Sequence, residues 1–275
     1  KEGVLVCLDA DDGKPRWDRR LPGEFGVSIP QWGFAGSPVV LGDALLVDVG
    51  RIIALDKMTG EKIWRTDDYG PAYSTPTPFK HRGRQLIAAF PAYGLVVLDA
   101  TTGRELASHA WETSYKVNAA TPIVVGDRIF ITSGYGKGAA LLRFDGRRLT
   151  VIWENIEMRS KMSTPVLIAG HLYGFDDKRL KCLDFATGER KWVQAGLGLG
   201  CLMAADGKLI ILSEDGKLAI ADASPSAYTQ ISGAQILDAS DCWTMPVLAS
   251  GRIYCRSSKG QLVCLDVRGA ESQSR

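Results

Sequence analysis

The sequence predicts an all-β fold made of repeated, four-stranded antiparallel units, and three observations support this prediction. A short pattern, typified by ALDKMTGEKIW at residues 54–64, returns along the chain at steps of 38 to 47 residues. Each copy joins an apolar run to a polar turn with Gly and then to a second short run, which is the pattern of a β-hairpin. The chain also has 30 glycines and 45% hydrophobic residues, which suits many turns around a sizeable core.

Each copy is marked by an Asp at its turn and, in four copies, by a Trp eight residues later. The aspartates are Asp9, Asp56, Asp99, Asp145, Asp184, Asp222 and Asp266, and the tryptophans are Trp17, Trp64, Trp153 and Trp192. Ala107 and Gln230 stand at the Trp position in two other copies. Asp can bond the backbone two residues on, and Gly60, Gly103 and Gly188 supply the positive φ of a tight turn. We expect these residues to be structural, with each Trp packed between neighbouring units and its indole N–H on a backbone carbonyl.

Taken in order, the chain begins with two strands within residues 3–20, which form a partial unit. Further units are expected to start near residues 37, 75, 121, 164, 201 and 245. Pro opens five of these six first strands, and because Pro cannot donate to a ladder, the first strand is predicted to be an edge. A repeat of ~43 residues whose first strand is an edge indicates the blades of a β-propeller. A helical solenoid would show a period of about 3.6 residues, so we expect one propeller domain over residues 1–275.

Composition narrows the possible partners. The net charge is +2 with both signs interspersed, so no nucleic-acid partner is expected. No apolar run approaches the ~18 residues of a membrane helix. The six cysteines include no CxxC pair, so no zinc site is expected, whereas a bridge between Cys242 and Cys255 stays open because sequence does not set its geometry.

The candidate binding residues lie in the links between strands. Links from a fourth strand to the next first strand share one end of a blade with links from the second strand to the third. That end holds Trp32, Tyr73, Lys116, Asn118, Tyr135, Lys137, Arg159, Lys161, Asp176, Lys178, Arg179, Trp243 and Lys259. This basic and aromatic set suits a protein partner with an acidic surface or a small acidic ligand. The opposite end carries short turns that offer little for recognition.

The motif LDxxTGxxxW, closing a unit that opens with TPVV, resembles the PQQ-like repeat named from pyrroloquinoline quinone enzymes, over residues 3–266. The resemblance implies a bacterial, exported or periplasmic propeller. Two branches are known: non-catalytic scaffolds, such as the propeller lipoproteins of outer-membrane assembly, and quinoprotein alcohol dehydrogenases. Since residues 3–20 supply only a third and a fourth strand, and residues 267–275 no closing strand, we expect a fragment of a seven- or eight-bladed ring, with a gap or an unpaired edge.

A dehydrogenase would need a carboxylate base and a calcium site beneath a stacked quinone. Asn118 and Asp176 are the candidates, although both also read as capped loop residues, and the family's adjacent cysteine pair is absent. The three histidines are scattered, and the GYGKG segment at residues 134–138 joins two strands and opens no helix, so it is no phosphate loop. We therefore expect a binding or scaffold protein without catalytic residues, metal or cofactor. PQQ and calcium belong to the alternative only, and the oligomeric state stays open.

Overall fold

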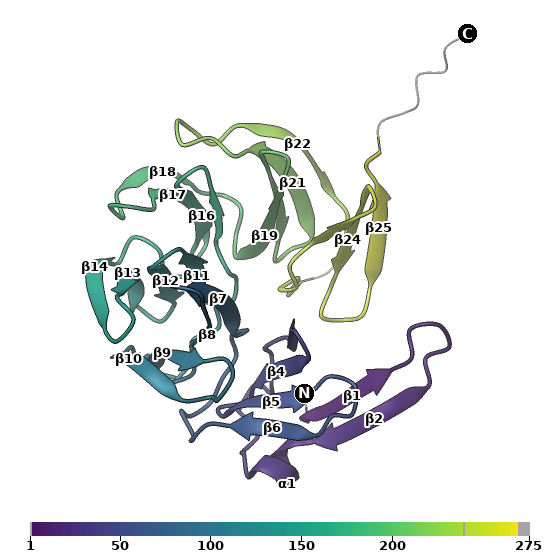
Figure 1. Ribbon diagram of the computed structural model, residues 1–275. Coiled ribbons are helices and arrows are strands. Elements are labelled where there is room, and N and C mark those ends of the chain that lie inside the picture. The colour runs from purple at the N-terminus through teal and green to yellow at the C-terminus, as the bar shows by residue number, and fades with distance from the viewer. Residues whose placement is uncertain (1, 239, 269–275) are drawn as a thin grey trace. The chain divides into compact units, whose positions relative to one another are not determined.

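The computed structural model describes residues 2–238 and 240–268, which form seven antiparallel sheets and one short helix. In every sheet each strand pairs with the next one along the chain (Figure 1). Contacts divide the chain into two compact units, Lys1–Lys161 and Met162–Arg275, and each is described by itself. No helix among the described residues is both long and apolar enough to cross a membrane.

The first unit holds four sheets. A two-stranded sheet of β1 (Val4–Leu8) and β2 (Pro15–Arg20) is followed by helix α1 (Leu21–Phe25). The second sheet consists of β3 (Val39–Leu41), β4 (Ala44–Asp48), β5 (Ile52–Asp56) and β6 (Lys62–Arg65). The third consists of β7 (Thr77–His81), β8 (Arg84–Ala89), β9 (Gly94–Asp99) and β10 (Glu105–Ala110). The fourth consists of β11 (Ile123–Val125), β12 (Arg128–Ser133), β13 (Gly138–Phe144) and β14 (Leu149–Asn155).

The second unit holds three sheets. The first consists of β15 (Val166–Ile168), β16 (His171–Asp176), β17 (Arg179–Asp184) and β18 (Arg190–Gln194). The next consists of β19 (Gly200–Ala205), β20 (Lys208–Ser213), β21 (Lys217–Asp222) and β22 (Gln230–Gln235). The last contains β23 (Val247–Ala249), β24 (Arg252–Arg256) and β25 (Leu262–Asp266). The predicted blades are confirmed, with first strands within two residues of the expected starts, and residues 269–275, where a closing strand was not expected, lie outside the described residues.

Burial within a blade changes from strand to strand. In β5 every residue except Asp56 is buried, so both faces of this middle strand are covered, and its first four residues, IIAL, form a continuous apolar run. In β6 only Trp64 is buried. The outer strand therefore contributes one large apolar side chain to the contact with the next blade.

The repeat tryptophans connect neighbouring blades. The indole Nε1 of Trp17 donates to the carbonyl oxygen of Lys57 at 3.2 Å, and that of Trp64 donates to Ala100 at 3.1 Å. A Cβ at Gly60 would lie 2.7 Å from the ring of Trp17, and one at Gly103 would lie 2.4 Å from the ring of Trp64. These turn glycines thus serve two purposes, since they hold a positive φ and they leave room for the Trp of the preceding blade.

Replacing Gly103 by Ala should lower the free energy of unfolding by about 2 kcal/mol or more, because a strained φ and an overpacked ring add up. Gly83 is the matched control, because its φ of +79° is close to the +72° of Gly103 but no atom lies within 4 Å of its missing Cβ. Chemical denaturation of Gly103→Ala and Gly83→Ala separates the two costs. Equal losses in both variants would mean that the contact with Trp64 contributes nothing.

The β13–β14 hairpin corrects the alignment of one copy. Trp64 pairs with Ala54, two residues before the Asp of its turn, whereas Trp153 pairs with Leu141, four residues before Asp145. This hairpin is two residues longer than the β5–β6 hairpin, so Asp145 lies beyond the structural place of the repeat Asp. The sequence does not show this shift. Relative to the residue that pairs with the Trp, both the Asp and the Trp lie two residues later in β13–β14 than in β5–β6, so their spacing stays the same.

The β21–β22 hairpin is also two residues longer, but here the extra residues follow the Asp. Ile220, two residues before Asp222, pairs with Ser232, and Gln230 pairs instead with Ala221. Ser232 therefore occupies the Trp register in this blade, where the sequence spacing pointed to Gln230.

Candidate functional site

The first unit carries a group of aromatic and basic side chains on five separate links. We name it the aromatic–basic cluster: Trp32, Tyr73, Tyr115, Tyr135 and Lys161. The links follow α1, β6, β10, β12 and β14, so all five lie at the end of the blades that was predicted to bind.

The members of the cluster form one aromatic pair and one group of two aromatic rings and a lysine. The ring centroids of Trp32 and Tyr73 lie 5.9 Å apart, and those of Tyr115 and Tyr135 lie 4.9 Å apart. The Lys161 ammonium lies 5.3 Å from the centroid of the Tyr135 ring, within the range of a cation–π interaction. Both Tyr115 and Tyr73 act electrostatically on Tyr135, which links the two aromatic pairs.

The cluster has a buried part and a solvent-exposed part, which differ in exposure and in pKa shift. Tyr73 is buried at 7% exposure, and burial raises its pKa, while a hydrogen bond with the backbone of Trp32 opposes the rise. Burial, then Tyr115 and Tyr73, raise the pKa of Tyr135. Trp32 and Tyr115 are 49% and 62% exposed, so they form the accessible part of the cluster. Such amphipathic aromatic side chains are enriched where proteins bind other proteins.

Two more lysines lie over aromatic rings on the same links. The Lys137 ammonium lies 4.5 Å from the centroid of Trp111, and that of Lys116 lies 5.6 Å from the centroid of Tyr93. Lys116 and Tyr135 also have positive φ angles of 56° and 58°, which are uncommon for non-glycine residues. Tyr93, Trp111 and Tyr115 were not among the predicted binding residues, although Tyr93 and Tyr115 lie on links at the same end of the blades.

Asn118 is buried inside the link that follows β10. Its Nδ2 donates to the carbonyl oxygens of Pro91 and Trp111 at 2.8 and 3.1 Å, and its Oδ1 accepts a hydrogen bond from Ser133 Oγ at 2.6 Å. At 1% exposure it is inaccessible to a ligand. Its amide holds two links together beneath the cluster.

Arg159, the remaining candidate of the first unit, is half-buried in the link after β14, two residues before Lys161. The other candidates belong to the second unit. Asp176 is 1% exposed, and its Oδ2 lies 2.8 Å from the Lys181 ammonium. Trp243 is 46% exposed, and Lys259 is exposed in the turn between β24 and β25. Asp176 thus differs from Trp243 and Lys259, because it is buried and forms an ion pair with a lysine.

None of the six cysteines is part of a disulfide, including Cys242 and Cys255, whose pairing the sequence left open. Burial raises the pKa of Cys242, and it raises that of Cys255 to about 11. Both thiols are therefore protonated at neutral pH.

The residues that the dehydrogenase alternative requires do not fit a calcium and quinone site. Calcium prefers several carboxylate, carbonyl and water oxygens around one accessible point. The Asn118 oxygen is taken by Ser133 and the Asp176 carboxylate is paired with Lys181. Across residues 2–238 and 240–268, no group of three or more His, Cys, Asp or Glu is placed to hold a metal ion.

Four-stranded antiparallel blades with this repeat define a propeller protein of the PQQ-like repeat class. The chain belongs to the family described as outer membrane protein assembly factor BamB, which matches residues 1–194. Among curated proteins, no sequence matches the chain.

Solved structures show the same fold. BamB from Moraxella catarrhalis has a TM-score of 0.72 and 20% identity, over 96% of this chain and 78% of its own. The computationally designed Ika8 protein has a TM-score of 0.69 and 13% identity, over 97% of this chain and 79% of its own. Quinohemoprotein alcohol dehydrogenase from Comamonas testosteroni has a TM-score of 0.65 and 13% identity, over 92% of this chain but only 53% of its own.

Proposed function

We propose that this protein is a non-catalytic scaffold of an exported, periplasmic assembly, and that it binds a protein partner through the aromatic–basic cluster. Membership of the BamB family supports the assembly role. The cluster is the observation that carries the binding role, because its exposed rings lie beside a lysine on links that leave the blades. A small acidic ligand is the second occupant that the same chemistry would accept.

The basic members of this end favour a partner with an acidic surface. Lys161 and Lys137 each lie over an aromatic ring, which orients the ammonium groups, and Arg159 lies two residues before Lys161 in the chain. Aromatic rings supply apolar area at low entropic cost, and the cations steer the encounter. The two contributions respond differently to salt, because only the charge term is screened.

Charge reversal tests this proposal. The double variant Arg159→Glu/Lys161→Glu should capture less partner from solubilised outer membranes than the unchanged protein, and the difference should shrink as salt is added. Lys62→Glu/Arg65→Glu is the matched control, because it reverses the same number of charges on exposed positions of β6. Equal capture by both double variants would place the binding surface elsewhere.

A separate test addresses the dehydrogenase alternative. We expect no quinone absorbance on the protein and no dye-linked alcohol oxidation when it is mixed with PQQ and calcium. The contacts of Asn118 and Asp176 support this expectation, since the side-chain oxygen of Asn118 accepts a hydrogen bond from Ser133 and the Asp176 carboxylate is ion-paired with Lys181. Measurable turnover would show that the protein is an enzyme.

A further inference from the structure

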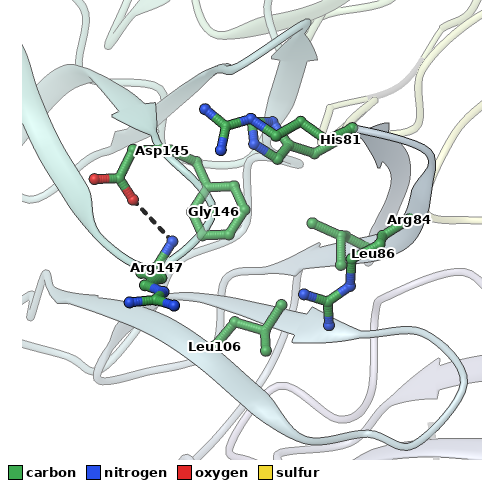
Figure 2. Close-up of a pocket in the computed structure, with 9 residues that line it drawn as sticks. His81, Arg84, Leu86, Leu106, Asp145, Gly146 and Arg147 are labelled. Carbon is green, nitrogen blue, oxygen red and sulfur yellow. Dashed lines mark hydrogen bonds between the residues drawn. The ribbon is translucent and has the colours of Figure 1, made fainter.

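A cavity of about 540 Å³ lies between two blades of the first unit, β7–β10 and β11–β14. Its walls come from the turn between β7 and β8, from β8 and β10, and from the β13–β14 hairpin (Figure 2). These turns lie at the end of the blades opposite to the aromatic–basic cluster. The cavity is therefore distinct from the site described above.

The cavity lies where the repeat loses its Trp. Ala107 pairs with Val97 in the register in which Trp64 pairs with Ala54, so a small side chain replaces the large one. Phe144 from the next blade is buried in the same hydrophobic cluster as Ala107. The longer β13–β14 hairpin carries Phe144 and the charged turn that follows it. Space beside this hairpin is left open at the surface.

The mouth of the cavity is positively charged. Its lining includes Arg82, Arg84 and Arg147 against one carboxylate, Asp145. Arg84 is paired with Asp99 at 2.8 Å, whereas Arg82 and Arg147 form no ion pair within the described residues. Figure 2 shows Arg84, the first residue of β8, and Arg147, from the turn between β13 and β14, with Leu106 between them in this view.

The Asp145 carboxylate does not neutralise the arginines. Its Oδ1 accepts the backbone N–H groups of Arg147 and Arg148 at 2.8 and 2.9 Å. These bonds, followed by the charges of Arg148 and Arg82, lower the pKa of Asp145, so it stays ionised. With the charge of Arg84 compensated by Asp99, the guanidinium groups of Arg82 and Arg147 against the one carboxylate of Asp145 still leave the lining with a net positive charge.

Two nitrogen atoms point to one place beside Gly146. A Cβ added to Gly146 would lie 3.6 Å from His81 Nε2 and 3.8 Å from Arg82 Nη1. His81 Nε2 is buried and has no hydrogen-bond partner among the described residues. An unpaired buried nitrogen costs free energy, and an acceptor or donor supplied by a ligand would offset that cost.

We propose that this cavity binds a small organic oxyanion, namely an apolar ring that carries a phosphate or carboxylate group. Leu86, Leu106 and Phe144 supply an apolar wall for the ring. Arg82 and Arg147 supply guanidinium groups, which bind planar or tetrahedral oxyanions through paired hydrogen bonds. The site does not depend on the protein-binding role of the other end.

Calorimetric titration at low salt with phenyl phosphate and with benzoate tests the site. Saturable binding of either compound supports it, and the stronger one identifies the head group. Benzyl alcohol, which lacks the charge, should show no measurable binding and should not compete with phenyl phosphate or benzoate. Arg82→Asn/Arg147→Ala should weaken binding by about tenfold or more, because it removes two guanidinium groups that would form charge-assisted hydrogen bonds with the oxyanion. Asn is chosen at position 82 because it tolerates the positive φ of 48° found there.

Two further variants separate charge from space. Leu106→Trp fills the cavity, so it should weaken phenyl phosphate while thermal unfolding stays cooperative. Arg104→Ala removes one charge from the same end of the β7–β10 blade but outside the lining, so affinity should be unchanged. No saturable binding of either anion to the unchanged protein, or equal affinity in Arg82→Asn/Arg147→Ala, would overturn the proposal.

Discussion

Replacing Lys181 by Met is expected to lower the free energy of unfolding by about 3–5 kcal/mol. The Lys181 ammonium and the Asp176 carboxylate are 2.8 Å apart, and their side chains are only 6% and 1% exposed. A buried ion pair gains little over an apolar pair, but removal of one partner leaves the other charge away from water. Denaturant unfolding at neutral pH measures the loss.

A surface pair in the same unit provides the control. Lys208 and Asp222 are 2.9 Å apart with side chains 44% and 42% exposed, so Lys208→Met should cost about 1 kcal/mol or less. The double variant Asp176→Asn/Lys181→Met should recover part of the stability lost by Lys181→Met alone, because it removes both charges of this buried pair. A similar cost for Lys181→Met and Lys208→Met would refute a structural role for the buried pair.

The pair also shows why the sequence predicted the blades better than the site. Blade periodicity is a local property, since every hairpin repeats its own turn residues and its own buried strand. Asp176 was a site candidate because it was assigned to the link between two strands, but the structure places it at the end of β16, buried and paired with Lys181 of β17. Burial of this kind depends on register and packing, which a single sequence does not give.

The oxyanion cavity was concealed for a related reason. Asp145 and Trp153 keep the eight-residue spacing of the other copies, so the sequence gives no sign of the lengthened hairpin. Only the pairing of Trp153 with Leu141 shows that the turn has moved outward. The replacement of Trp by Ala107 was visible in the sequence. The cavity that results from this replacement was not visible in the sequence, because it also depends on Phe144, which reaches the same hydrophobic cluster from another blade.

Asp48 is expected to give the stability of the protein an unusual dependence on pH. The residue ends β4 and is 4% exposed, and burial raises its pKa to about 7, opposed by the backbone N–H of Gly50. Its Oδ1 accepts that N–H at 3.0 Å, but its Oδ2 has no partner among the described residues. A buried carboxyl group without a cation nearby favours its neutral form.

The sign of the effect follows from proton binding. Below a pH of about 4 the carboxyl is protonated in both the folded and the unfolded state, so Asp48 adds no pH dependence. Between about 4 and 7 the unfolded chain loses this proton while the folded one keeps it, so the contribution of Asp48 to stability falls as pH rises. The whole window corresponds to a loss of about 4 kcal/mol at most.

Asp48→Asn removes this titration while keeping the shape of the side chain. The stability of the variant relative to the unchanged protein should therefore rise between a pH of about 4 and 7, by about 2–4 kcal/mol, and stay constant above it. Denaturant unfolding at several pH values measures this difference, which cancels the titration of all other groups. A difference that is independent of pH would contradict the shifted pKa of Asp48.

Asp56→Asn is the control of opposite sign. Backbone N–H groups of Thr59 and Met58 lower the pKa of Asp56, so its contribution to stability is present near neutral pH and is lost as pH falls through the lowered value. Relative to the unchanged protein, Asp56→Asn should therefore become less stable as pH rises from the acid range, whereas Asp48→Asn becomes more stable. Because both residues end strands of the same sheet, opposite slopes would assign the effect to the burial of Asp48 rather than to its position in the blade.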